Sequence, residues 1–327
     1  MDFKKILNMT IKVVLPLVIG CLLFWFLYRG TDFGELWTLL KRGVRYDILL
    51  FSLVFGLAAN IVRAVRWGLL IDTLGEHYKM KNLVFAVLGN YAVNLVFPRM
   101  GEVWRCGIIT KYEKISFTKL LGTLLIDRVA DAISVGLILV GIVCFNAGFF
   151  KTFLANNPSL MISFPDYWII ILFLIIVAAV WYTFTRLKHL TFVQKSIGVL
   201  SNVWEGMKSV WLMEHKGLFI IQTVMIWGLY FIYFYTTFYA FGFTEHLGVR
   251  VGLIAFTMSS IGVAVPIQGG LGPWHFMVIN TLIVFSVSGA DAKNFAFVVF
   301  AVQTLWQALC GIFGIAALSI TNKAVDK

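Results

Sequence analysis

Charged side chains are scarce in this sequence. Asp, Glu, Lys and Arg make up 13% of its 327 residues, against roughly a quarter in soluble domains. No polar stretch is long enough to fold by itself. Hydrophobic residues make up 60% and recur in runs that match the thickness of a bilayer. We therefore expect one integral membrane domain over residues 1–327, built as an all-α polytopic bundle.

Cysteine and enzyme motifs are also lacking. The four cysteines form no close pair, which argues against a disulfide framework or a zinc site. The sequence holds no Gly-rich phosphate loop, His-Glu-x-x-His, Cys-x-x-Cys or Gly-x-Ser-x-Gly motif. We expect no enzymatic activity, metal or cofactor. The net charge of +11 does not indicate nucleic acid, because Lys and Arg lie in short loops between apolar runs.

Apolar runs of near-bilayer length predict six full spans. They cover residues 11–28, 49–71, 120–146, 167–185, 218–241 and 295–320. Two further apolar regions, 82–115 and 250–289, are each interrupted, so each forms either a re-entrant hairpin or a pair of short spans. The total is then about eight transmembrane helices.

The distribution of basic residues predicts the orientation. Lys and Arg crowd residues 186–217 and the region after the first interruption, whereas 147–166 carries only Lys151 among basic residues. Because cytoplasmic loops are rich in Lys and Arg, 147–166 should face outside and both termini the cytoplasm. The loop 29–48 is basic although it should face outside, and its leucines predict an interfacial amphipathic helix.

Pro/Gly breaks cause the two interruptions, over 97–102 and 266–273. Lipid cannot satisfy the backbone groups that such breaks free, so they survive only beside protein or water. Pro98 and Pro266 are 168 positions apart, and the same shift brings the spans of one half close to those of the other. The pattern predicts an inverted-topology repeat with halves at about 1–146 and 166–320, with chance similarity as the alternative.

Several polar residues in the first half are candidates for binding an anion. Arg63 and Arg66 share a helix face, either snorkelling to the interface or lining a lipid-phosphate site. At the break, Arg99 and Arg105 flank a new helix start, which suits phosphate. Glu102 alternatively caps that helix and pairs with Arg105.

Further candidates lie on both sides of that break and inside the following span. Asn94 shares a face with Asn90 four residues earlier. Asp127 and Asp131 share another face, and Arg128 is in reach of Asp131. Three charges so deep in a span predict buried partners, with Arg63, Arg66 and Arg99 as the candidates. Direct ligand contact is the alternative.

At the second break, glycines allow close backbone approach and Pro273 suits a first helical turn. The candidate binding residues there are Gln268, Gly269, Gly270, Gly272 and His275, although a lone histidine is more often structural. The Tyr/Phe-rich run from Tyr230 to Phe243 is interpreted as a packing or lipid-facing surface.

Three motifs resemble the flippase-like membrane domain of lysylphosphatidylglycerol synthases, which also occurs in stand-alone bacterial and archaeal proteins. They are Arg63-Ala-Val-Arg66-Trp67, Asn94-Leu-Val-Phe-Pro98-Arg99-Met-Gly101-Glu102 with the later Asp127-Arg128 and Asp131, and Pro266 with Gly269-Gly270-Leu271-Gly272. The resemblance implies lipid movement between leaflets, in a bacterial cytoplasmic membrane.

The chain departs from that family in two respects. It ends without the cytosolic aminoacyl-transfer domain, so a stand-alone member without lipid aminoacylation is expected. His275 stands where family members often carry an acid, which argues against a cationic head group.

The expected function is translocation of an anionic phospholipid or lipid-linked intermediate, by a chain compatible with a homodimer. The alternatives are a membrane-embedded transferase for a lipid-linked substrate and a non-catalytic scaffold for a lipid-modifying enzyme.

Overall fold

The computed structural model describes residues 33–158, apart from Pro98, and 214–322. It also describes seven residues near the start: Val18, Cys21, Leu22, Phe24, Trp25, Tyr28 and Arg29. The predicted span 167–185 and most of the span 11–28 and of the basic loop 186–217 lie outside the described residues. The side chain of Gln268 lies outside them too.

Four described helices are long and apolar enough to cross a membrane. They are α3 (Tyr46–Asp72), α6 (Phe117–Phe145), α10 (Lys216–Thr236), which continues as the short helix η2 (Thr237–Ala240), and α13 (Gly289–Thr321). They match the predicted spans 49–71, 120–146, 218–241 and 295–320. The all-α class is confirmed, since the only β pairing in the described part of the chain is an isolated bridge between Val44 and Phe241.

Each Pro/Gly break divides its apolar region into two shorter helices. The first separates α4 (Met80–Val96) from α5 (Met100–Glu113). The second separates α11 (Val249–Ala264) from α12 (Pro273–Val284), with the 3-10 turn η3 (Gln268–Gly270) between them.

Proline chemistry explains where α4 and α11 end. A proline disfavours helical geometry in the residue before it. Phe97, before Pro98, has φ −121° and ψ 104°, and Val265, before Pro266, has φ −62° and ψ 132°. Both residues are therefore extended, and neither helix continues through its proline.

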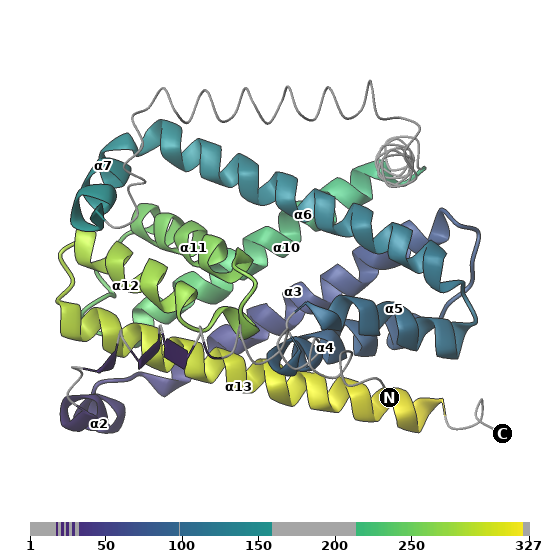
Figure 1. The fold of residues 1–327 in the computed structure, drawn as a ribbon, viewed down its shortest axis with the longest axis horizontal. Helices are drawn as coiled ribbons and strands as arrows, with labels where there is room; N and C mark the ends of the chain where they lie inside the picture. Colours follow the sequence, from purple (N-terminus) through teal and green to yellow (C-terminus); the bar gives the residue numbers. More distant parts are fainter. Residues whose placement is uncertain are drawn as a thin grey trace.

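The two central helices, α3 and α10, pack side by side and antiparallel (Figure 1). The start of α3 meets the end of α10 through a hydrogen bond from Arg45 N to Ala240 O at 2.9 Å. Because each short helix pair follows directly on α3 or α10, the α4–α5 pair begins at one end of the bundle and the α11–α12 pair at the other. Figure 1 shows them on opposite sides, right and left.

Polar contacts also hold the base of each short helix pair, by which we mean the end where its two helices lie farthest from the Pro/Gly break. Asn82, near the start of α4, donates to Glu113 at the end of α5 and exchanges hydrogen bonds of 3.1 and 3.0 Å with Asn322 after α13. At the other end, Arg250 Nε, near the start of α11, donates to Asn146 Oδ1 after α6 at 2.5 Å. Each pair is thereby tied to the end of a long helix from the other half.

The Pro/Gly break of each pair forms a turn between its two helices, which we call its inner turn. The inner turns of the two pairs meet in the middle of the molecule. Arg99 Nη2, in the first turn, donates to Ala264 O at the end of α11, at 2.6 Å. A Cβ placed on Gly269, in the second turn, would lie 3.2 Å from Cδ2 of Leu95. The last residues of α4 and α11 are 168 positions apart, as are Gly101 and Gly269. These equal offsets support an inverted repeat.

Two shorter helices flank this core. The predicted amphipathic helix within 29–48 is α2 (Phe33–Arg42), whose Leu36 is buried among core residues of α10 and α13. The sequence analysis assigned 147–166 to the outer side without naming a helix, and α7 (Ala147–Asn156) forms there. It forms because its aromatic residues find an apolar surface: Phe149 stacks on Phe285 with ring centroids 5.6 Å apart.

Candidate functional site

Six charged residues from three helices, five of them buried, form one cluster, which we call the arginine cluster. Helix α3 supplies Arg63 and Arg66, α5 supplies Arg105, and α6 supplies Asp127, Arg128 and Asp131. All six are sequence-predicted site residues. Four guanidinium groups face two carboxylates, so the cluster carries a net charge of +2.

Arg66 lies at the centre of this cluster. Its Nη2 donates to Asp127 Oδ1 at 2.6 Å and to Asp131 Oδ1 at 2.7 Å, and its Nε donates to Asp127 Oδ1 at 3.1 Å. Arg63 Nη1 donates to Asp131 Oδ2 at 2.5 Å. Both arginines are buried in the protein, at 4% and 0% exposure. The interpretation that they snorkel to the interface is therefore wrong, because carboxylates inside the bundle hold them.

The side chain of Arg105 is fully buried but only partly paired. Its Nη2 lies 3.4 Å from Asp127 Oδ2, and its guanidinium carbon lies 4.2 Å from the centre of the Trp67 ring. Trp67 in turn donates from Nε1 to Thr123 Oγ1 at 3.0 Å, which fixes the ring. Nε and Nη1 of Arg105 have no hydrogen-bond partner among the described residues. Two donors of a buried cation are therefore left unused.

Arg128 lies at the outer side of the cluster. Its side chain is 35% exposed, and Nη2 approaches Asp127 Oδ2 at 3.2 Å. The predicted contact with Asp131, one helical turn further on, is confirmed at 3.5 Å. Nε of Arg128 is buried and has no partner within the described part of the chain.

Two tyrosines extend the arginine cluster, and the sequence analysis missed both. Tyr230 on α10 donates to Asn60 Oδ1 at 2.7 Å and accepts from Arg63 Nε at 3.4 Å. Its hydroxyl also lies 2.9 Å from that of Tyr91 on α4. Tyr230 is therefore part of a polar network as well as of the aromatic surface assigned to it. The predicted repeat held one signal for Tyr230. It follows Arg63 by 167 positions, close to the 168-residue offset, so it lies near the position of the second half that corresponds to Arg63.

At the first break, Asn94 holds the start of α5. Its Oδ1 accepts from Gly101 N at 2.8 Å, and its Nδ2 donates to Glu102 Oε2 at 3.3 Å. The backbone N–H group at Gly101, assigned to phosphate from the sequence, is thus occupied within the protein. Glu102 accepts from Asn94, whereas Arg105 pairs with Asp127.

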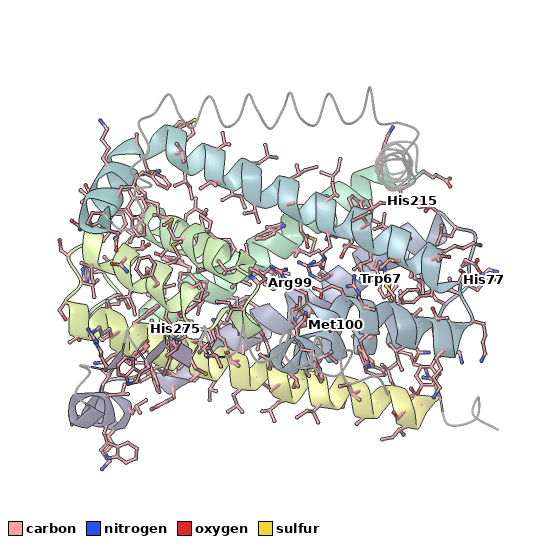
Figure 2. The ribbon with its side chains drawn as sticks, viewed as in Figure 1. Trp67, His77, Arg99, Met100, His215 and His275 are labelled. Carbon is pink, nitrogen blue, oxygen red and sulfur yellow. The ribbon has the colours of Figure 1, made fainter. Side chains whose placement is uncertain are left out.

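Arg99 lies apart from the arginine cluster although the sequence placed it among the candidate partners. It has φ 61°, and its guanidinium reaches the Ala264 carbonyl at the end of α11. In Figure 2 it lies near the middle of the molecule, between the two broken helix pairs. Since C-terminal carbonyls of a helix lack partners within it, a cation there is favourable. Arg99 joins the two breaks.

The candidates at the second break form a separate group. Gly269, Gly270 and Gly272 have φ of 58°, 78° and 90°, a backbone that other residues rarely adopt. Gly272 N donates to Nδ1 of His275 at 3.4 Å. The His275 ring is fully buried beside Phe300, with centroids 4.3 Å apart. Figure 2 shows His275 well away from Trp67, which marks the arginine cluster.

The described residues contain no group of three or more His, Cys, Asp or Glu side chains arranged to hold a metal ion.

The long apolar helices, the broken helix pairs and the buried charges together define a polytopic integral membrane protein. Residues 13–311 match the family described as the lysylphosphatidylglycerol synthase TM region. The chain belongs to this family, as its motifs predicted. Searches of curated proteins and of solved structures found no match.

Proposed function

We propose that the protein is a lipid translocase that moves an anionic phospholipid or lipid-linked intermediate between leaflets, without a covalent step. Membership of a lipid-related membrane family supports a lipid substrate. The cluster's net positive charge, away from water, supports an anion.

The observation that carries this proposal is the unused pair of donors on Arg105. A buried cation without full pairing is costly, and each free guanidinium N–H can form a charge-assisted hydrogen bond with a phosphate oxygen. Arg66 cannot play the same part, because both Asp127 and Asp131 already bind it closely. Arg105 and Arg128 are thus the groups that hold the phosphate, and Arg66 holds the carboxylates in position.

The same geometry gives a route to the site. Arg105 belongs to α5, whereas its partner Asp127 belongs to α6. Since Arg105 is fully buried, α5 must move away from α6 before a head group reaches it. We assign this movement to the broken helix pair α4–α5, whose inner turn carries the hydrogen bonds of Arg99 to Ala264 and of Gly101 to Asn94.

We propose that α4–α5 and α11–α12 are re-entrant hairpins that enter the bilayer from opposite sides, within an inverted repeat. Two observations support this. The antiparallel α3 and α10 place the bases of the two pairs at opposite ends of the bundle, and the inner turns touch through Arg99 and Ala264. Irregular backbone at membrane depth is tolerated where protein surrounds it.

The end of the bundle that carries the base of α4–α5 faces the cytoplasm in this proposal, in a bacterial inner membrane. Lysines gather there, which is typical of cytoplasmic loops. They are Lys79, Lys81, Lys111, Lys114 and Lys119. Arg66 lies six residues before the end of α3, or about 9 Å along the axis. The arginine cluster therefore lies closer to the cytoplasmic surface than to the outer one.

The test uses protein reconstituted into liposomes with fluorescent phosphatidic acid or phosphatidylglycerol, while a membrane-impermeant reductant quenches the outer leaflet. Protein should speed crossing of at least one of these lipids over protein-free liposomes. Arg105→Gln should slow it by at least about tenfold, since it removes a charge at the site.

Arg45→Gln is the matched control, because Arg45 is an exposed arginine at the other end of α3. It should leave crossing unchanged. Equal crossing with and without protein, for both lipids, would refute the proposal. A chemically altered lipid recovered from the liposomes would favour the transferase alternative.

A further inference from the structure

The charge balance of the arginine cluster restricts which phosphate group suits it. The charged and titratable groups that face one another there come from five helices. They are Arg63 and Arg66 of α3, Tyr91 of α4, Arg105 and Cys106 of α5, Asp127, Arg128 and Asp131 of α6, and Tyr230 of α10. With the tyrosines and the thiol neutral, the sum is +2. Glu102, on the same helix as Arg105, instead accepts a hydrogen bond from Asn94.

The two oxygens of Asp127 have different roles. Oδ1 is held closely by Arg66, at 2.6 and 3.1 Å. Oδ2 is approached by three arginines at longer distances: Arg128 at 3.2 Å, Arg105 at 3.4 Å and Arg63 at 3.8 Å. Three cations thus share one carboxylate oxygen. A second, larger anion at this point would satisfy them better.

The unused donors of the arginine cluster also favour a further anion at this point. Nε and Nη1 of Arg105 and Nε of Arg128 are buried and have no partner among the described residues. A phosphate monoester presents three acceptor oxygens and a charge of about −1.5 to −2 near neutral pH. A phosphodiester presents two unesterified oxygens and a single charge. It would leave the cluster at +1.

We infer that the arginine cluster takes the dianionic phosphate monoester of a lipid in preference to a phosphodiester. This inference rests on the proposed function, which requires only that an anionic lipid binds. It adds the class of head group, because only a dianion neutralises the net charge of +2. Free phosphate shares this chemistry, so the test must separate it from the lipid.

The test measures equilibrium binding to the full-length protein in detergent micelles. The probes are dioleoyl phosphatidic acid, dioleoyl phosphatidylglycerol with the same chains, and inorganic phosphate. Near pH 8, phosphatidic acid should bind at least about tenfold tighter than phosphatidylglycerol, because one further unit charge meets the cluster. Towards about pH 5 the monoester dianion takes up one proton, with a pKa near 6, and becomes a monoanion. The preference should then shrink, with phosphatidylglycerol binding nearly unchanged.

Two variants sharpen the result. Arg128→Gln lowers the net charge to +1 at a partly exposed residue, so the fold should survive and the preference should fall several-fold. Arg45→Gln should keep the full preference, since Arg45 is exposed and pairs with Asp47.

Failure of this inference alone can be distinguished from failure of the proposed function. Equal affinity for the two lipids at both pH values would overturn the monoester preference and leave translocation standing. Binding of neither lipid would count against both proposals. Displacement of phosphatidic acid by inorganic phosphate at equal concentration would assign the site to free phosphate and overturn the lipid head group.

Discussion

Phe234 and Phe295 pack edge to face with ring centroids 6.4 Å apart, and each follows a member of the Arg66–Asp127 ion pair by 168 positions. Helices α10 and α13 therefore bring together the positions that correspond to the ion pair between α3 and α6. One half of the chain fills this contact with charges and the other with aromatic rings. The arrangement supports the proposed inverted repeat, in which one half holds the arginine cluster and the other has aromatic rings at the corresponding positions.

Arg66→Met should destabilise the protein far more than loss of an exposed ion pair. The variant leaves Asp127 without its two closest hydrogen bonds. Removing one partner of a buried ion pair costs about 3–5 kcal/mol. Thermal unfolding in detergent measures the effect. Lys119→Gln, which breaks an exposed pair with Glu76, should cost less than about 1 kcal/mol. Similar losses for both variants would contradict the central role of Arg66.

Gly101→Ala should disrupt the first break, whereas Gly107→Ala on the same helix should not. A Cβ on Gly101 would overlap the Asn90 carbonyl oxygen and lie 2.8 Å from Cγ of Asn94. A Cβ on Gly107 would meet nothing within 4 Å, and Ala favours a helix over Gly by about 1 kcal/mol. Unfolding temperatures should fall for the first variant and hold or rise for the second. Equal shifts would show that α5 does not approach α4 this closely.

The sequence predicted the parts of this fold that depend on local chemistry. Four spans and both breaks lie within a few residues of their expected positions. Apolar length sets the span, and a proline acts on the residue directly before it. The pairing of Arg128 with Asp131 was equally accessible, because it depends only on helical spacing.

Contacts between distant helices were harder to predict. Arg63 and Arg66 were named as partners of the buried aspartates and are so, but Arg99, named with them, joins Ala264 instead. The path of the turn decides this, and spacing does not encode it. Tyr230 was missed because an aromatic run looks alike whether its hydroxyl groups face lipid or polar partners.

Tyr230→Phe tests whether the tyrosine hydroxyl organises the arginine cluster. The change removes the donor to Asn60, the acceptor for Arg63 and the hydroxyl contact with Tyr91 while keeping the ring. Each of the three lost hydrogen bonds is worth about 0.5–1.5 kcal/mol, so thermal stability should fall by roughly 1.5–4.5 kcal/mol. Tyr239→Phe is the control, since Tyr239 is exposed and its hydroxyl contacts that of Tyr235. Equal effects for the two variants would place Tyr230 outside the network.

Arg99→Ala tests whether the two broken helix pairs hold each other at their inner turns. The variant removes the hydrogen bond from Arg99 to the Ala264 carbonyl, which leaves that helix end without its cation. Because Arg99 is exposed and lies apart from the buried ion pairs, global stability should change by only about 1 kcal/mol.

Local opening should respond more strongly than the stability of the whole protein. Hydrogen exchange of the amides around both breaks should accelerate by about tenfold, since a loss near 1.4 kcal/mol shifts a local equilibrium by that factor. Amides in the middle of α3 should keep their protection. Arg99→Lys retains the charge, so its exchange rates around the breaks should lie between those of the wild-type protein and those of Arg99→Ala. If exchange rises around the first break alone, Arg99 stabilises only its own turn, and the contact between the two broken helix pairs does not govern their opening.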